Sequence, residues 1–331
     1  MISENHESIL ITAGFTAYNA AETIEKALQS ALSQTWQPLE IVVIDDASTD
    51  NTPDVLENIR TRHEQIRIFR NEKNKGVATS RNRILENAKG KYVAFFDDDD
   101  ISLPDRIASQ FQRISKYERE YANGQPVICH TARIQHFPDG SEIYIRTMGE
   151  RLNCIAPNGI SVARRILMGA SLEDGYGSCA TCSQMARLST YRDLGGFDSN
   201  LRRAEDTDIN IRLARAGGHF VGISRPLVIQ TMTKTTEKNL EVEYRNTILL
   251  FEKNRDFFRT QNEYDFCMRW LEVKYAYFEK QWLLFLSRIF SVFIKYPLRT
   301  LHRIKMSFPN IKLNQSLSYF HTNSEKNHKN G

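Results

Sequence analysis

The sequence predicts an α/β fold, with a mostly parallel central sheet flanked by helices and a helical, basic extension after it. Three observations predict this fold class. Short apolar runs alternate with helical patterns through the first 130 residues, which is typical of β-α-β units. Two of the runs end in clusters of carboxylates, as strands do at the ligand-binding edge of an open α/β sheet. Beyond residue 236 the pattern becomes helical and rich in Lys and Arg.

Each strand expected in the first part of the chain is a short apolar run bounded by turn-forming residues. These runs are Ile9 to Ala13, Glu40 to Ile44, Ile66 to Arg70, Tyr92 to Phe96 and Pro126 to Thr131. Residues 20–33 place apolar side chains at helical spacing, which predicts a helix packed on the sheet. Asp50 to Thr52 precede Pro53 and predict the start of a second helix, while Gly90 ends a third that begins near Val77.

The second part of the chain is less regular. From Ile134 to Thr181 we expect loops and short strands around a site, followed by helices at Cys182 to Asp193 and Glu205 to Ala216. The predicted organisation is a catalytic domain over residues 1–235, a helical extension over 236–312 and a disordered tail over 313–331.

Composition excludes several classes of protein. With 331 residues, 41% hydrophobic and 25% charged, the chain is an ordinary globular protein, neither disordered nor fibrous as a whole. Residues 269–331 hold 11 Lys and Arg against three Glu, a charge of +8, so the rest of the +4 chain carries −4. Because the positive charge is confined to this apolar-rich end, no nucleic-acid partner is expected.

The five cysteines are an odd number in a long chain, which favours a reducing compartment and predicts a cytoplasmic protein. Cys179 and Cys182 have the spacing of half a zinc site or a redox pair. No second pair accompanies them, so structural or incidental thiols are the favoured interpretation. The polar first residues do not resemble a signal peptide.

The segment from Trp282 to Ile294 is strongly apolar. At 13 residues, with Arg288 inside, it is too short and too charged to span a bilayer of about 30 Å. Cations surround it, which predicts that residues 280–305 lie on an anionic membrane surface as a peripheral, interfacial helix. The alternative is a helix packed on the catalytic domain or in a homodimer.

Four consecutive carboxylates, Asp97 to Asp100, follow the strand that ends at Phe96. Such a cluster is stable where a divalent cation neutralises it. Alternate residues of an extended segment face the same way, so Asp97 and Asp99 are expected to converge on Mg²⁺ or Mn²⁺ shared with substrate phosphates. An acidic, solvated turn is the alternative.

Asp45 and Asp46 end a neighbouring strand and are expected at the same cleft. A carboxylate there can accept the imide proton of uracil, although a helix cap and turn would explain the same residues. The glycine-rich phosphate loops of ATPases and nicotinamide dehydrogenases are absent. A bound diphosphate would therefore need a metal and a cation such as Arg81.

Three segments, FTAYNAAETIEKALQSALSQTWQPLEIVVIDDASTD, NKGVATSRNRILENAKGKYVAFFDDDDISLPDR and LGGFDSNLRRAEDTDINIRLARAGG, resemble the family 2 glycosyltransferases, which have the GT-A fold. The resemblance extends from about Ile9 to Ile229, in the family's order and spacing. It implies a metal-dependent, inverting transfer of a sugar from a nucleotide diphosphate, most often a UDP-sugar, to an acceptor hydroxyl.

The resemblance also implies roles for individual residues. Asp206 would be the catalytic base, and its place at the start of a helix favours a carboxylate there, although simple helix N-terminal charge is the alternative. Asp99 would be the metal ligand, joined by Asp97. The implied donor-binding residues are Thr16, Tyr18, Asp46, Arg81, Asp97 and Asp98; the acceptor-side candidates are Gly196, Phe197 and Glu205.

Departures from the family pattern refine this expectation. Thr16 stands where many relatives have Pro, and no His near residues 228–236 completes a metal site. The Gln-x-x-Arg-Trp signature of processive synthases is absent, which favours a single addition to a glycan of the lipopolysaccharide, capsule or exopolysaccharide type, with a lipid-linked acceptor expected. The alternatives are a sugar-phosphate nucleotidyltransferase and a non-catalytic nucleotide- or glycan-binding module.

Overall fold

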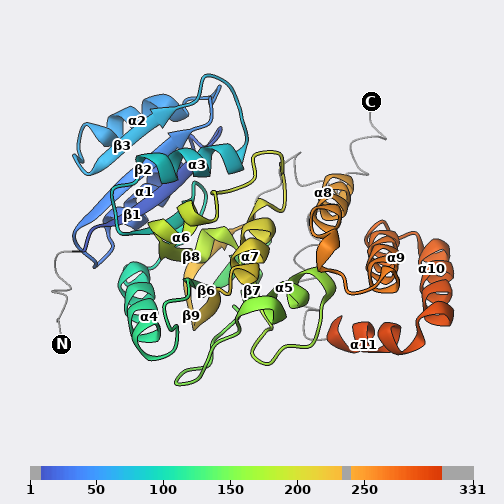
Figure 1. The fold of residues 1–331 in the computed structure, drawn as a ribbon. Coiled ribbons are helices and arrows are strands. Elements are labelled where there is room, and N and C mark those ends of the chain that lie inside the picture. Colours follow the sequence, from blue (N-terminus) through green and yellow to red (C-terminus); the bar gives the residue numbers. More distant parts are fainter. Residues whose placement is uncertain (1–8, 233–239, 308–331) are drawn as a thin grey trace, which may run out of the picture. The chain divides into compact units, whose positions relative to one another are not determined.

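The computed structural model describes residues 9–232 and 240–307 (Figure 1). These residues form two compact units. The first comprises residues up to 163 together with 172–232, and the second comprises residues 164–171 together with the chain from 240 onward. The domain boundary predicted at residue 235 and the tail predicted from 313 both fall outside the described residues, so these two predictions stay untested.

A mixed, mostly parallel sheet forms the centre of the first unit (Figure 1). Its order is β3-β2-β1-β4-β8-β6-β9-β5, with β7 paired to β6. The strands β3, β2, β1 and β4 are mutually parallel, whereas β8 runs antiparallel between β4 and β6. The strand bounds are β1 Ile11–Ala17, β2 Leu39–Asp45, β3 Ile66–Arg70, β4 Tyr92–Asp97, β5 Ile101–Ser102, β6 Val127–His136, β7 Glu142–Ile145, β8 Gln184–Arg187 and β9 His219–Thr231.

Helices flank this sheet, which confirms the predicted fold class. Buried side chains of β1, α1 and α4, such as Phe15, Leu28 and Phe111, belong to one hydrophobic core. The helix bounds are α1 Ile24–Leu32, α2 Thr52–Arg60, α3 Val77–Asn87, α4 Arg106–Glu120, α5 Gly159–Met168, α6 Leu188–Asp193 and α7 Glu205–Arg215, with a short 3-10 turn, η2, at Thr181–Ser183. The first four predicted strands match β1 to β4 within a few residues.

The structure corrects the prediction between residues 134 and 193. The segment expected as loops and short strands contains a ten-residue helix, α5. The predicted helix from Cys182 to Asp193 is instead a 3-10 turn, the strand β8 and the six-residue α6. Gln184 is fully buried between β4 and β6, so pairing across the sheet, and not local periodicity, makes this segment a strand.

The second unit is helical, as predicted. It contains α8 Leu240–Lys253, a 3-10 turn η3 Arg255–Phe257, α9 Gln261–Phe278, α10 Trp282–Lys295 and α11 Pro297–Ser307. Its interior includes Phe266, Val273, Val292 and Tyr296, all buried. Among the described helices, none combines the length and the apolar composition that crossing a bilayer requires.

Candidate functional site

The acidic turn from Asp97 to Asp100 lies at the carboxyl end of β4. In the parallel pairing of β1 with β4, Asp97 stands opposite Thr16. Asp97 remains 30% exposed, whereas Asp100 is buried and accepts a hydrogen bond from the backbone N–H of Thr231, at 3.1 Å. The Asp98 carboxylate accepts from the backbone N–H of Tyr18, also at 3.1 Å. The turn thus ties β4 to the end of β1.

Negative charge accumulates in this turn. Burial, followed by repulsion from Asp99 and Asp97, raises the pKa of Asp98 to about 8. Burial and the same two neighbours raise the pKa of Asp100 well above its ordinary value, and Arg133 opposes the rise only in part. Carboxylates that hold protons in this way lack sufficient positive charge around them, which is the electrostatic condition of a cation site.

The turn offers oxygen ligands for a divalent cation. Ligand atoms of Asp97, Asp100 and Cys182 lie within 4.8 Å of one another, and one oxygen of Asp100 is buried without a hydrogen-bond partner. The carboxylate oxygens suit Mg²⁺ or Mn²⁺. The Cys182 thiol does not, because sulfur ligands select softer metals. The sequence prediction paired Asp97 with Asp99 and missed Asp100; the role of Asp99 stays a prediction.

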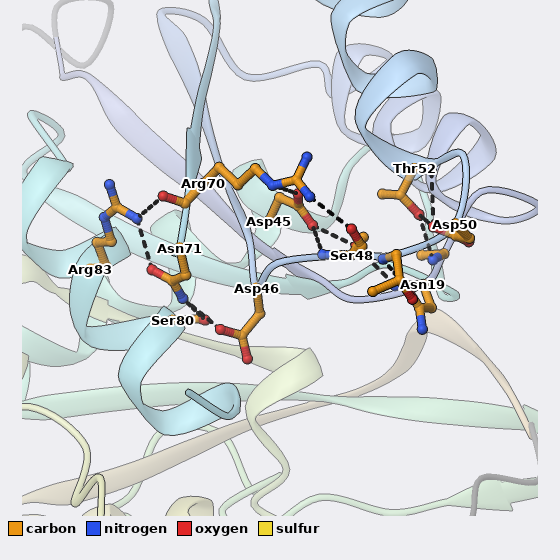
Figure 2. A network of polar contacts seen from close by, with 12 residues as sticks. Asn19, Asp45, Asp46, Ser48, Asp50, Thr52, Arg70, Asn71, Ser80 and Arg83 are labelled. Carbon is orange, nitrogen blue, oxygen red and sulfur yellow. Dashed lines mark hydrogen bonds and ion pairs between the residues drawn. The ribbon is translucent and has the colours of Figure 1, made fainter. Parts of the chain in front are cut away.

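Asp45 and Asp46 lie at the end of β2, beside β1 and β3 (Figure 2). Asp45 accepts hydrogen bonds from the backbone and hydroxyl of Ser48, which shapes the turn after the strand. Asp46 accepts from the Asn71 side chain at 2.6 Å and from the backbone N–H groups of Lys75 and Gly76 at 3.0 and 2.7 Å. Asp46 therefore fastens the segment between β3 and α3 to the end of β2.

Asn71 is a site residue that the sequence prediction missed. Figure 2 shows its side chain between Asp46 and Arg83, where it donates to Asp46 and to Ser80 and accepts from Arg83. Its position one residue after β3 was the available signal, because neighbouring parallel strands bring their carboxyl ends together. Tyr18 completes this edge with a side chain that is 44% exposed and accessible to a ligand.

Arg81, on α3, joins the acidic turn to the start of α7. Its guanidinium donates to Glu205 at 2.6 Å and lies 3.6 Å from Asp97, although the residue is only 6% exposed. Burial acts to lower the pKa of Arg81, but Glu205, Asp97 and Asp206 outweigh that effect and raise it. The structure therefore brings Arg81, Asp97, Glu205 and Asp206 into one charged cluster.

Asp206 differs from its acidic neighbours in accessibility. Glu205 is buried against Arg81, and Asp208 is buried and bonded to Arg212 at 2.8 Å. Asp206 is partly exposed and accepts from the backbone N–H of Thr207 at 2.6 Å, within the first turn of α7. Of the three carboxylates in that turn, Asp206 is the one available to a substrate.

Phe197 contacts the cluster through Arg81, and Gly196 precedes Phe197 in the loop between α6 and α7. Phe197 is 2% exposed, its ring packs edge-to-face on Phe95, and the Arg81 guanidinium lies 5.4 Å from its centre. Asn82 bonds both the N–H and the carbonyl of Phe197, at 2.7 and 2.8 Å. In this structure Phe197 positions Arg81 and offers no exposed surface; the predicted acceptor-side role stays untested.

Comparisons with known proteins identify the family. Residues 12–163 match the model of glycosyl transferase family 2. The protein EpsE of Bacillus subtilis (strain 168) is described as a glycosyltransferase and is 30% identical to this chain over 243 residues. The match covers 72% of this chain and 79% of EpsE. This chain belongs to glycosyl transferase family 2.

Two further relatives match over shorter stretches. WfaP of Escherichia coli, named a UDP-Glc:alpha-D-GlcNAc-diphosphoundecaprenol beta-1,3-glucosyltransferase, is 39% identical over 116 residues. That match spans 34% of this chain and 45% of WfaP, so the chain matches less than half the length of that relative. TuaG of Bacillus subtilis, whose name places it in teichuronic acid biosynthesis, is 40% identical over 29% of this chain and 38% of TuaG.

Solved structures show the same fold. Residues 1–349 of S. aureus TarS, solved in complex with UDP-GlcNAc, superpose with a TM-score of 0.60 over 97% of this chain and 92% of that one. Sequence identity is 16%, so this likeness is evidence for the fold alone and not for the substrate.

Proposed function

We propose that this chain transfers one sugar, with inversion, from a nucleotide-diphosphate sugar to a hydroxyl group of a growing glycan. The observation that supports this proposal most directly is the Arg81 cluster. It holds the acidic turn of β4 and the accessible carboxylate of Asp206 in one place, so that donor and base would meet. Family membership adds independent support for sugar transfer.

The donor is proposed to be a UDP-sugar. Thr16, Tyr18 and Asp46 lie at the ends of two adjacent strands, where a base can stack on the exposed Tyr18 ring. Asp46 has spare acceptor capacity beyond its loop contacts, since each carboxylate oxygen can accept two hydrogen bonds. Arg81 lies beside the acidic turn, where it can meet a diphosphate. Asp98 would support this donor site through its bond to Tyr18.

Asp206 is the proposed general base. The Asp206 carboxylate removes the proton of the acceptor hydroxyl. As it does so, the oxygen of that hydroxyl forms a bond to the anomeric carbon, and the bond from the anomeric carbon to the β-phosphate oxygen breaks. Such proton transfer contributes typically about 10²- to 10⁴-fold in rate. One displacement without a covalent sugar intermediate inverts the anomeric centre.

Asp97 and Asp99 are the proposed ligands of the divalent cation, Mg²⁺ or Mn²⁺. When bound, such an ion stabilises charge on the leaving diphosphate as a Lewis acid. The raised pKa values of Asp98 and Asp100 support a cation at this turn, because binding would relieve the repulsion among the carboxylates.

The acceptor is proposed to be a lipid-linked glycan, at the inner face of the cytoplasmic membrane. Support comes from WfaP, whose name specifies an acceptor on diphosphoundecaprenol. The proposed activity then serves assembly of a surface polysaccharide, one sugar for each acceptor.

The test is release of UDP from a panel of UDP-sugars with Mn²⁺, using water as a slow acceptor. Asp206→Asn is expected to lower the rate at least about 100-fold while UDP affinity stays within about twofold. Asp208→Asn is the matched control on the same helix turn. The rate of the folded Asp208→Asn protein should stay within about tenfold of the wild-type rate. Equal rates for wild type and Asp206→Asn would overturn the assignment of the base.

A further inference from the structure

Two helices of the second unit present an apolar stripe to solvent. On α10, Leu283, Leu286, Phe290 and Ile294 are exposed by 86%, 58%, 66% and 65%, and their spacing of three, four and four residues places them on one helix face. On α11, Leu298 and Leu301 are also exposed, by 81% and 55%. These six residues are called the α10–α11 face below.

The opposite side of the same helices already has partners. Val292 is buried, and the Tyr296 ring packs edge-to-face on Phe266 of α9. Arg288 donates to the carbonyl of Glu272 on α9, at 3.1 Å. The α10–α11 face is therefore not needed to pack the helices onto their own unit, and several large apolar side chains exposed on two successive helices mark an interaction site.

The charge around the α10–α11 face has a single sign. Residues 280–305 contain six Lys and Arg and no Asp or Glu. Arg288 and Arg303 are turned inward, toward the carbonyls of Glu272 and Met168. The four that remain exposed are Lys280, Lys295, Arg299 and Lys305.

We propose that the α10–α11 face binds the surface of an anionic phospholipid bilayer, with both helices lying in the plane of the interface. The six apolar side chains would enter the boundary between headgroups and acyl chains, while the exposed cations meet lipid phosphates. A second copy of the chain fits this surface less well, because a two-fold interface would bring the four cations of each copy together. The inference goes beyond the proposed sugar transfer and does not depend on it.

The test is flotation of the full-length protein with vesicles of phosphatidylcholine alone or mixed with phosphatidylglycerol. Wild type is expected to float with the anionic vesicles. Leu286→Glu/Ile294→Glu should weaken this binding at least about tenfold, because it places charge in the apolar stripe. Leu152→Glu/Ile155→Glu is the matched control, since those residues are exposed by 65% and 66% on the first unit and should leave flotation unchanged.

A variant that removes two exposed cations measures the electrostatic contribution to vesicle binding separately from the apolar contribution. Lys295→Gln/Arg299→Gln should weaken binding to anionic vesicles about ten- to thirtyfold and make it less sensitive to salt. Circular dichroism on every variant checks that the helices remain folded. The proposal is overturned if Leu286→Glu/Ile294→Glu still floats like wild type, if the matched control loses as much binding, or if the face proves to be a dimer contact in light scattering without any vesicle binding.

Discussion

Arg81 connects parts of the chain that lie far apart in sequence. Its guanidinium bridges Asp97 at the end of β4 and Glu205 at the start of α7; the side chains of Arg81 and Glu205 are nearly buried, whereas that of Asp97 is partly exposed. A buried ion pair adds little net stability, but removing one partner leaves an uncompensated buried charge. Arg81 is therefore a residue where function and folding stability are linked.

We expect Arg81→Met to lower the free energy of unfolding by about 3–5 kcal/mol, because it leaves Glu205 buried without its cation. Arg81→Met/Glu205→Gln should recover part of that loss. Urea unfolding measures both, with Arg62→Met as control, since Arg62 forms an exposed pair with Glu25 and should cost less than about 1 kcal/mol. A double variant no more stable than Arg81→Met would refute this explanation.

His130 predicts how stability depends on pH. The residue is fully buried on β6, and burial followed by Arg133 lowers its pKa from 6.5 to about 3. Below pH 6.5, the His130 side chain of the unfolded chain takes up a proton that the folded protein does not. The free energy of unfolding therefore falls as the pH drops, by at most about 1.4 kcal/mol per pH unit for this group.

His130→Gln should therefore flatten the curve of unfolding free energy against pH between about pH 6.5 and pH 4. The control is His302→Gln, at an exposed position, which should leave the slope of that curve as in wild type. Urea titrations across this range measure the slope. The same slope in wild type and His130→Gln would contradict the account.

At the scale of elements, the loop between α6 and α7 depends on two glycines with different constraints. Gly195 and Gly196 both have left-handed backbones, with φ of 75° and 70°. A Cβ on Gly195 would meet open space, whereas one on Gly196 would lie 2.4 Å from the side-chain oxygen of Asn82, which holds Phe197.

Gly195→Ala should thus cost about 1–2 kcal/mol from backbone strain alone, and Gly196→Ala should cost more because it also displaces Asn82. Comparing the two by urea unfolding isolates the contact. If both variants lose the same stability, Asn82 is not a fixed support of this loop.

Local pattern predicted some elements and not others. The strands β1, β2 and β4 were predictable because their apolar runs are buried on both faces of a parallel sheet. The edge strand β3 is only partly buried, and its mostly alternating apolar and basic residues were the signal there. β8 begins with the polar Gln184, and β9 contains Gly222 and Pro226 beside a register shift with β6, so neither has a strand-like local pattern. Their conformation depends on neighbours far away in sequence.

At the scale of the whole molecule, the same distinction applies to the site. The carboxylates after β2 and β4 were predictable because parallel strands end at one edge of the sheet. The contact of Arg81 with Glu205 joins residues 124 apart, and the Asn71 contact with Asp46 depends on loop packing. The family resemblance supplied Arg81 and Glu205 but not their pairing. The carboxylate run included Asp100, but the alternation of an extended strand selected Asp97 and Asp99 as ligands, because the turn after β4 cannot be predicted from that alternation.

Positive and negative charge are unevenly distributed along the chain. Residues 269–331 carry +8 and the remainder −4. The acidic remainder contains the proposed metal-binding turn, and the basic part contains the α10–α11 face. Donor binding and membrane binding are thus assigned to different units, so each can be lost without the other.

Calorimetric titration of UDP into the purified protein, with Mn²⁺ and then with EDTA, tests whether this edge of the sheet is a nucleotide-sugar site. We expect binding that requires the metal, that is lost in Asp99→Ala, and that is weaker or absent for ADP and GDP. Metal-dependent preference for another base would contradict the uracil contact assigned to Asp46. No binding of any nucleotide would contradict the assignment of this site to a nucleotide-sugar donor.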